Sequence, residues 1–370
     1  MSITKHSSLY LNWYIHVPQV KYDFRSSGIS YFKYNLTLGE VDLNANYSKL
    51  LSELLAQRYN VKPENVFISS EGASGQNARI IRYLAEKDGK KREAIVEYPT
   101  YEPLLRQVQE HFPCVKRLER RKSEAYRLDV EELQKKVSEK TRLLVLTNPH
   151  APSGTIANAN ELKEIMAAAS EYGFYVLCDE IYAEFDRSVV PTLFSIDKNL
   201  GIVTTSFTKA YGLGGLRLGI ALAKEDLVEE LYNDVVNTIG GSVSIVQLIA
   251  AELLKKDMDK LEKHKQKWTS IKSETEKWLS ERGFRYFPNK TGVTYWIELP
   301  IKDTYRWINE HAIPKHGLTP VPGAFFLFKS NYKLVKSNMV RLGLGNVNPD
   351  NPNLAEAFEA FEKALETYRS

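Results

Sequence analysis

The chain has 370 residues, enough for a large hydrophobic core that is most often divided between two domains. Its 50 basic and 46 acidic residues leave a net charge of +4, so we expect neither a nucleic-acid nor a membrane partner. The sequence shows no membrane-spanning apolar run, and residues 1–18 lack the pattern of a signal peptide. Its two cysteines are far apart and its seven histidines have no metal-binding spacing. We therefore predict a cytoplasmic protein without a disulfide framework or a metal site.

The first 40 residues are rich in aromatic side chains and contain a loop-like stretch at 23–29. Periodicity leaves two interpretations open for this segment, a piece packed on a domain surface or a flap over a site. Leucines at helical spacing predict a helix over 46–59 that ends near Asn60.

Short apolar runs then alternate with amphipathic helices. The helices are predicted to run up to Lys87, up to His111, from Asp129 to Glu139, and over 158–171. The apolar runs are at 66–68, 94–96, 143–146, 174–178, 202–204 and 216–223. This alternation predicts an α/β fold, with a large domain whose mostly parallel sheet is flanked by helices on both faces.

A polar side chain follows most of these apolar runs. In parallel sheets, ligands bind beyond the carboxyl ends of the strands, so such residues are expected to meet at one edge. The residues concerned are Ser74, Tyr101, Asn148, Asp179, Ser206 and Lys209.

The rest of the chain reads as helices followed by a smaller α+β unit. A strongly helical segment covers 244–280, and strands are predicted at 292–299, 324–328 and 339–344. Helices are predicted at 302–311 and 354–368. We place a large cofactor-binding domain at 41–274 and a small domain at 1–40 and 275–370.

The stretch 205–219 carries the strongest local signal for a site. Lys209 lies there among small residues and glycines, and Arg217 follows it. Hydroxyl groups and an arginine bind phosphate oxygens, and a partly desolvated lysine reacts with aldehydes. One alternative is a solvated loop. Another is a dinucleotide fingerprint, which is disfavoured because Arg217 stands at its third glycine position.

Four motifs, in order, resemble the pyridoxal-phosphate-dependent aminotransferases of class I/II, the fold-type-I group. They are Asn-Pro-His-Ala-Pro-Ser-Gly at 148–154, Asp-Glu-Ile-Tyr at 179–182, Ser-Phe-Thr-Lys at 206–209 with Gly-Leu-Arg-Leu-Gly at 215–219, and Val-Arg-Leu at 340–342. The Asn-x-x-Pro-x-Gly loop found near the N-terminus of several branches is not visible here. Arg25 to Gly28 stand near its place.

The resemblance implies a pyridoxal 5′-phosphate cofactor bound covalently to Lys209, which would also act as acid and base. Asp179 would pair with the ring nitrogen. Asn148 and Tyr182 would contact the ring 3′-oxygen, and Tyr182 would share in catalysis. The phosphate would be held by Gly72, Ala73, Ser74, Ser206 and Arg217.

Three further roles follow from the same resemblance. Tyr101 would stack on the cofactor ring, with Tyr98 as the alternative. Tyr47 would reach the phosphate in the neighbouring subunit of a homodimer. Its other interpretation is an ordinary tyrosine at a helix start.

For the substrate, the resemblance implies that Arg341 holds the α-carboxylate, with Asn148, Gly28 and Arg25 nearby. An amino group would move between an α-amino acid, either aspartate/glutamate or aromatic, and a 2-oxo acid. Other fold-type-I reactions, a β-lyase, decarboxylase or synthase, remain alternatives. A pyridoxal-phosphate-sensing regulatory module is disfavoured, because the pattern starts within the first fifty residues.

Overall fold

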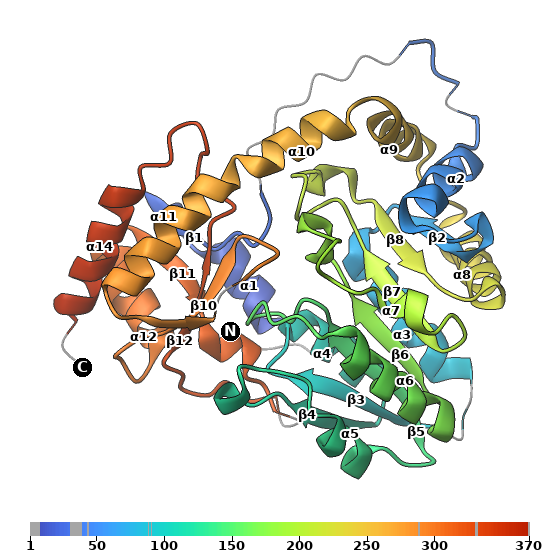
Figure 1. The fold of residues 1–370 in the computed structure, drawn as a ribbon, viewed down its shortest axis with the longest axis horizontal. Coiled ribbons are helices and arrows are strands. Elements are labelled where there is room, and N and C mark those ends of the chain that lie inside the picture. The colour runs from blue at the N-terminus through green and yellow to red at the C-terminus, as the bar shows by residue number, and fades with distance from the viewer. Residues whose placement is uncertain are drawn as a thin grey trace.

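Two β-sheets organise the protein (Figure 1). The computed structural model describes residues 8–29, 39–42, 44–87, 89, 91–287, 289–329 and 332–368. Residues 1–7 and 30–38, which belong to the predicted small domain, lie outside the described residues. Within these ranges, no helix is both long and apolar enough to cross a membrane.

The large sheet has seven strands in the order β2-β8-β7-β6-β5-β3-β4. Only β8 runs against its neighbours, while β3 to β7 are mutually parallel. This confirms the predicted fold class. The strands are β2 (Val66–Ser69), β3 (Glu93–Tyr98), β4 (Cys114–Glu119), β5 (Thr141–Thr147), β6 (Tyr175–Asp179), β7 (Gly201–Thr205) and β8 (Gly219–Leu222).

Alternating side chains of the large sheet enter two different hydrophobic clusters. In β5, Leu144 and Leu146 belong to one cluster, and Leu143 and Val145 to the other. Both sets are buried because helices cover both faces of the sheet. The first cluster includes residues of α2 (Ser48–Tyr59), α5 (Val130–Lys136), α6 (Ala159–Tyr172), α7 (Leu193–Ile196) and α9 (Ser244–Lys256), and the second those of α3 (Gly72–Lys87), α4 (Glu102–His111) and α8 (Glu225–Ile239).

Helix α6 shows how local sequence sets these boundaries. Asn158 accepts hydrogen bonds at its start, and Glu161 closes a capping box with it. Gly173 ends the helix in the left-handed conformation, at a φ of 66°. The predicted helix over 158–171 is thus confirmed to within one residue at each end.

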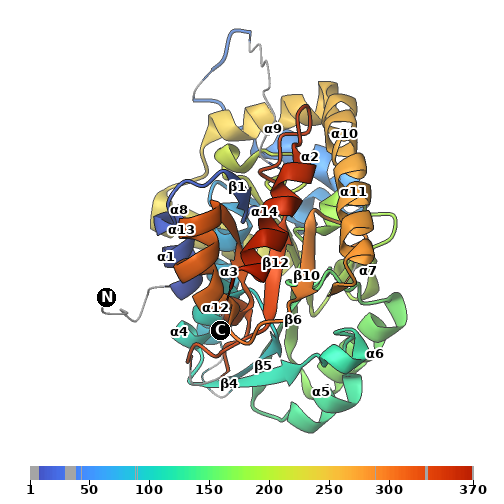
Figure 2. The ribbon, with the colours of Figure 1, turned by 90° about the vertical axis from the view of Figure 1, so that its left-hand side faces the viewer.

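The small sheet has five strands in the order β1-β11-β12-β10-β9. Its helices α11 (Trp268–Glu281) and α14 (Leu354–Glu366) pack on it at the outside of the molecule (Figures 1 and 2). The strands are β1 (Tyr22–Phe24), β9 (Arg285–Phe287), β10 (Thr294–Glu298), β11 (Leu318–Pro322) and β12 (Met339–Gly343). A bent helical segment between β10 and β11 comprises α12 (Thr304–Trp307), the π-helical turn η5 (Ile308–Ala312) and α13 (Ile313–His316).

Three predicted elements differ from the structure. The strand expected at 324–328 is wrong, since Gly323–Phe326 form a 3-10 turn (η6) after β11. The strand expected from Leu216 begins only at Gly219. The helical segment 244–280 is divided into α9, α10 (Met258–Gln266) and α11. Asp257 causes the first break, because its backbone leaves the helical region.

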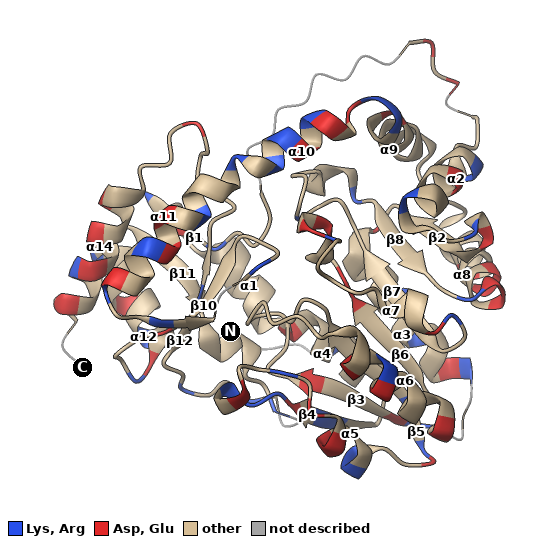
Figure 3. Ribbon diagram, in the orientation of Figure 1, with Lys and Arg blue, Asp and Glu red and all other residues tan. Residues whose placement is uncertain are grey.

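The segments that lie between the two sheets or connect them position the site. Helix α1 (Leu9–His16) contributes Tyr10 to the cluster that also holds Phe67 of the large sheet and Trp296 of the small one. In Figure 1, α1 lies between the two sheets, and α9 to α11 lead from one to the other. Acidic and basic residues are interspersed along α10, whereas the charged residues of α14 are mostly glutamates (Figure 3).

Candidate active site

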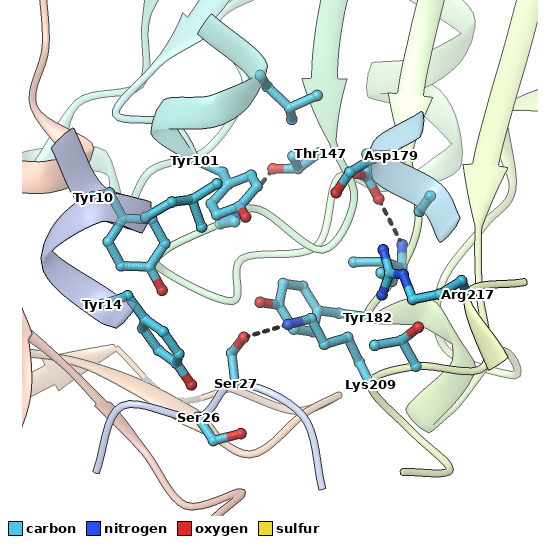
Figure 4. Close-up of a pocket in the computed structure, with 17 residues that line it drawn as sticks. Tyr10, Tyr14, Ser26, Ser27, Tyr101, Thr147, Asp179, Tyr182, Lys209 and Arg217 are labelled. Atoms are coloured by element: carbon cyan, nitrogen blue, oxygen red, sulfur yellow. Dashed lines mark hydrogen bonds between the residues drawn. The ribbon is translucent and has the colours of Figure 1, made fainter. Parts of the chain in front are cut away.

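A cavity of about 450 Å³ lies beyond the carboxyl ends of the large-sheet strands. Its size is typical of a small-molecule site. Figure 4 shows Tyr10 and Tyr14 of α1 on one side, and Asp179 and Arg217 on the other. The lining residues are Tyr10, Leu11, Tyr14, Ser26, Ser27, Ala73, Ser74, Tyr101, Leu104, Thr147, Ala151, Asp179, Ile181, Tyr182, Thr208, Lys209 and Arg217.

Lys209 enters this cavity from the loop that follows β7. Its Nζ donates to Ser27 Oγ at 3.0 Å, across the gap between the two sheets (Figure 4). Its backbone carbonyl accepts from the Ile29 amide at 2.9 Å. Burial lowers the pKa of Lys209, and the positive charge of Arg341 acts in the same direction. A lysine with a lowered pKa is more often the neutral, nucleophilic amine.

Asp179 is the last residue of β6 and is buried at the cavity floor. Its Oδ2 accepts from Asn77 Nδ2 at 2.8 Å, and its Oδ1 from the Ile181 amide at 3.0 Å. Burial raises the pKa of Asp179, while these two hydrogen bonds and the charge of Lys209 oppose the rise. The carboxylate therefore has the donors that an ionised group needs inside a protein.

Anion-binding groups gather at the start of α3. Gly72 has a φ of +71°, and a Cβ atom there would stand 2.5 Å from an Arg217 guanidinium nitrogen. The positive φ favours glycine at this position, whereas the Arg217 side chain could shift to make room for a Cβ atom. Ala73 and Ser74 expose the first turn of the helix to the cavity, where free N–H groups attract anions. Arg217 is exposed, and among the described residues it donates to two backbone carbonyls, at 3.3 Å each.

Arg341 lies in β12, directly behind the cavity wall. Its side chain donates to Tyr10 Oη and to the Arg25 carbonyl, both at 2.9 Å. It is 2% exposed, its Nε has no partner, and within the described part of the chain no carboxylate pairs with it. Buried arginines are nearly always paired, so this guanidinium is suited to bind an anion.

Arg25, in contrast, already has its carboxylate. Its guanidinium donates to both oxygens of Asp23, at 2.9 and 2.7 Å, and to the Tyr14 carbonyl at 2.8 Å. Arg25 is not part of the cavity lining, and the phenol rings of Tyr10 and Tyr14 lie there instead.

The remaining predicted site residues lie outside the lining. Asn148 follows Thr147, accepts from the Ala157 amide at 2.9 Å and makes only long contacts through Nδ2. Ser206 is buried against Thr208. Gly28 packs on Lys209, and Tyr47 donates to the Asp42 carbonyl at 3.0 Å.

Of the two tyrosines at and just after the end of β3, Tyr98 and Tyr101, Tyr101 lines the cavity and Tyr98 does not. The pKa of Tyr101 is raised well above the ordinary value by burial. Tyr98 packs instead over the guanidinium of Arg117, 5.5 Å from the ring centroid.

Sequence reasoning missed several residues of the site. Ser27 and Thr208 lie inside the loop at 23–29 and the Ser-Phe-Thr-Lys motif at 206–209, but no role was predicted for their side chains. Tyr10 and Tyr14 stand four positions apart, which on a helix places both on one face, and this spacing was the available signal. Asn77 had no signal of its own, because it lies inside a helical pattern.

Comparison with known proteins gives one family. Residues 19–358 match the family model described as aminotransferase class I and II. Histidinol-phosphate aminotransferase 2 of Carboxydothermus hydrogenoformans is 30% identical over 188 residues, and the chain spans about half of that relative, 49% of each protein. Aspartate aminotransferase of Sulfolobus acidocaldarius is 24% identical over 304 residues, covering 77% of this chain and 74% of the relative.

Solved structures show the same fold. A PLP-dependent aminotransferase from Streptococcus suis covers 97% of both chains with a TM-score of 0.82 at 21% identity. A double mutant of Thermus thermophilus aspartate aminotransferase covers 87% of this chain and 83% of its own, with a TM-score of 0.75 at 19% identity.

Proposed function

The chain belongs to the class I and II aminotransferases, a family of pyridoxal-phosphate-dependent enzymes, and we propose that it moves an amino group between an aromatic α-amino acid and a 2-oxo acid. The observation that carries this proposal is that Lys209 and Asp179 line the same cavity. Lys209 has a pKa lowered by burial, and Asp179 is a buried carboxylate with its own donors.

The residues of the cavity fit the cofactor. Lys209 would bind its aldehyde, and Asp179 would face its ring nitrogen. Ala73, Ser74 and Arg217 would hold the phosphate, because the N-terminus of a helix and a guanidinium meet there. When bound, pyridoxal phosphate supplies an aldehyde carbon and an electron-accepting ring.

Other residues would complete the cofactor site. Tyr101 would lie against the ring, and Tyr182 would donate to its 3′-oxygen. Asn148 would also donate to the 3′-oxygen. Its Nδ2 makes long contacts, of 3.3 and 3.5 Å, to two carbonyls among the described residues. Ser206 would support the phosphate site through its 2.8 Å contact with Thr208.

In catalysis, Lys209 would take the proton from the substrate Cα and return it at another carbon. A lowered pKa suits this role, because the neutral amine accepts a proton near neutral pH. Ser27 Oγ, 3.0 Å from Nζ, would orient the amine. Asp179, kept ionised, would stabilise positive charge on the ring nitrogen.

The substrate carboxylate would bind Arg341, whose buried guanidinium lacks a carboxylate partner among the described residues. For the substrate side chain, the cavity offers the rings of Tyr10 and Tyr14 together with Leu11 and Leu104. Since Asp23 already neutralises Arg25, this lining favours an aromatic side chain over an acidic one.

A stoichiometric half-reaction tests this function. The cofactor-loaded enzyme is mixed with one amino acid at a time, and the products are measured. Transamination should release one equivalent of the matching 2-oxo acid, with the aromatic amino acids reacting fastest. Release of carbon dioxide or ammonia instead would overturn the proposal in favour of a decarboxylase or lyase.

We also propose a cytoplasmic homodimer in which Tyr47 reaches the partner's phosphate site. Support comes from its place at the start of α2, outside the cavity lining of its own chain. Mixing a Tyr47→Phe chain with a Lys209→Ala chain should restore part of the activity. Each mixed dimer then has one intact site, formed by Lys209 of the first chain and Tyr47 of the second. An active enzyme that sediments as a monomer would contradict the dimer.

A further inference from the structure

Asn77 connects two elements behind the cavity floor. It lies in the second turn of α3 and is 2% exposed. Its Nδ2 donates to Asp179 Oδ2 at 2.8 Å, and its Oδ1 accepts from Thr204 Oγ1 at 2.6 Å. Asn77 itself does not line the cavity, so any effect on the reaction passes through Asp179.

The large sheet brings the two partners of Asn77 together. Asp179 and Thr204 are register partners on the parallel strands β6 and β7. Side chains of register partners point to the same face of a sheet, and here that face is the one covered by α3. One amide therefore bridges two adjacent side chains, both more than nine-tenths buried.

Chemistry fixes the direction of both hydrogen bonds. An ionised carboxylate only accepts, so Asn77 must turn its NH₂ group toward Asp179. Its carbonyl oxygen then faces Thr204, which has to donate. If the amide were reversed, two oxygens would meet without a proton between them. The threonine hydroxyl, which can donate or accept, thus serves as the donor and supports the amide orientation that favours a charged Asp179.

We propose that Asn77 and Thr204 form a positioning pair that keeps Asp179 ionised and aimed at the cofactor ring nitrogen. This inference rests on the proposed function, which gives Asp179 its role at the ring. The hydrogen bond from Asn77 is charge-assisted, the stronger kind, and it offsets part of the burial that favours a neutral carboxyl. Neither Asn77 nor Thr204 lines the cavity, so both are positioning residues.

Three other titratable side chains act near the carboxylate. Lys209 lowers the pKa of Asp179 through its charge. Tyr182 and Cys178 have pKa values raised by burial and are neutral near pH 7. Among these side chains, Lys209 is therefore the only one whose charge helps to keep Asp179 ionised.

The test is a titration of Asp179 in the full-length apoprotein. Carboxyl carbons of ¹³C-aspartate report each pKa by NMR, and the Asp179→Asn spectrum identifies the signal. Asn77→Leu should raise this pKa by about one unit or more. Thr204→Val should raise it by a smaller amount, and Thr204→Ser should restore it. Thr275→Val, at a buried threonine that bonds only within α11, is the matched control and should change nothing.

The same variants should move the acid limb of the pH profile of kcat. A raised Asp179 pKa means that the ionised form appears at higher pH, so the limb of Thr204→Val should shift upward. Unchanged titration of Asp179 in both Thr204→Val and Asn77→Leu would overturn the proposal. If Asn77→Leu does not fold, an unchanged Thr204→Val is sufficient to overturn it. A separate result would contradict the proposed function, namely normal turnover in Asp179→Ala. That result would not affect the titration of the apoprotein.

Discussion

Gly28 lies against Lys209 so closely that a Cβ atom on Gly28 would stand 2.7 Å from Lys209 Cδ and 2.8 Å from its Cα. The next residue donates its amide to the Lys209 carbonyl at 2.9 Å. This loop, from the other end of the chain, thus fixes both the backbone and the side-chain stem of the lysine. The two interpretations of the aromatic N-terminal segment were a piece packed on a domain surface and a flap over a site. Its described part supplies Tyr10, Tyr14, Ser26 and Ser27 to the cavity lining, which favours the second.

Gly28→Ala should therefore displace Lys209. The overpacking is expected to lower the free energy of unfolding by about 1–3 kcal/mol and to reduce the cofactor bound per chain. Gly215→Ala is the matched control, because a Cβ there would meet nothing within 4 Å. Equal cofactor content in the two variants, measured by absorbance after gel filtration, would contradict the contact.

Lys209→Ala should bind pyridoxal phosphate only non-covalently. Borohydride reduction of the loaded wild-type protein, followed by peptide mapping, should label Lys209. Lys272 is an internal control, since burial also lowers its pKa, but its Nζ donates to the Asn289 carbonyl at 2.9 Å. A label on Lys272 or Lys224 would refute the assignment.

Arg341→Lys should weaken use of every amino acid. Lysine keeps the charge but lacks the planar fork that binds a carboxylate through two parallel hydrogen bonds. We expect a loss of about 2–4 kcal/mol in kcat/KM, chiefly through a higher KM. Normal kinetics with all amino acids would remove Arg341 from the site.

Arg25→Ala distinguishes the two substrate classes. Because the guanidinium of Arg25 is paired with Asp23 and absent from the cavity lining, its loss should leave the ratio of aromatic to acidic substrates unchanged. The measurement is kcat/KM for one aromatic and one acidic amino acid in the same preparation. Selective loss of the acidic substrate would show that Arg25 turns toward the site when substrate binds.

Glu102→Gln should change how stability depends on pH. Burial raises the pKa of Glu102 from 4.5 to about 7, although a hydrogen bond from Ser8 and the charge of Arg106 oppose it. The fold thus favours the protonated carboxyl. Its contribution is complete below about pH 4.5 and is lost as the pH rises to about 7, by up to about 3 kcal/mol.

Denaturant unfolding at pH 5 and pH 8 checks this sign. Wild type should lose stability between the two values by the Glu102 contribution, and Glu102→Gln should not, since the amide does not titrate. Glu359→Gln, at an exposed glutamate of α14, is the control. Parallel pH dependence in wild type and Glu102→Gln would show that this carboxyl does not couple to folding.

The sequence predicted the buried strands of the large sheet well, including β2 at one edge, but not the half-exposed strand β4 at the other edge. Central strands such as β5 are continuous apolar runs, since both faces are covered. Strand β4 was missed because it is an edge strand, half exposed, with charged residues such as Lys116 and Glu119. The strand expected at 324–328 failed because aromatic content there reflects packing in a shared core rather than pairing.

For the candidate site, the sequence indicated the edge but not every side chain. Lys209 and Asp179 follow apolar runs, and parallel strands bring such residues together. The same rule placed Asn148 and Ser206 there, whereas their neighbours Thr147 and Thr208 line the cavity. The end of a strand therefore locates the site in the sequence to within a residue or two. The conformation of the turn after the strand determines which side chain faces the cavity. Contacts such as Ser27 with Lys209 join distant segments and leave no periodic pattern.

The central position of β12 in the small sheet also sets an order of events during synthesis. A ribosome adds ~5–20 residues per second, so Arg341 emerges on the order of 10 s after Lys209. During that interval the nascent chain carries the lysine proposed to bind the cofactor without the guanidinium proposed to hold the substrate, and β10 and β11 still lack the strand that joins them. Assembly of the complete proposed site would therefore be a late step in the biogenesis of this protein, and any chain that stops before β12 would present the amine without the guanidinium proposed to hold the substrate carboxylate.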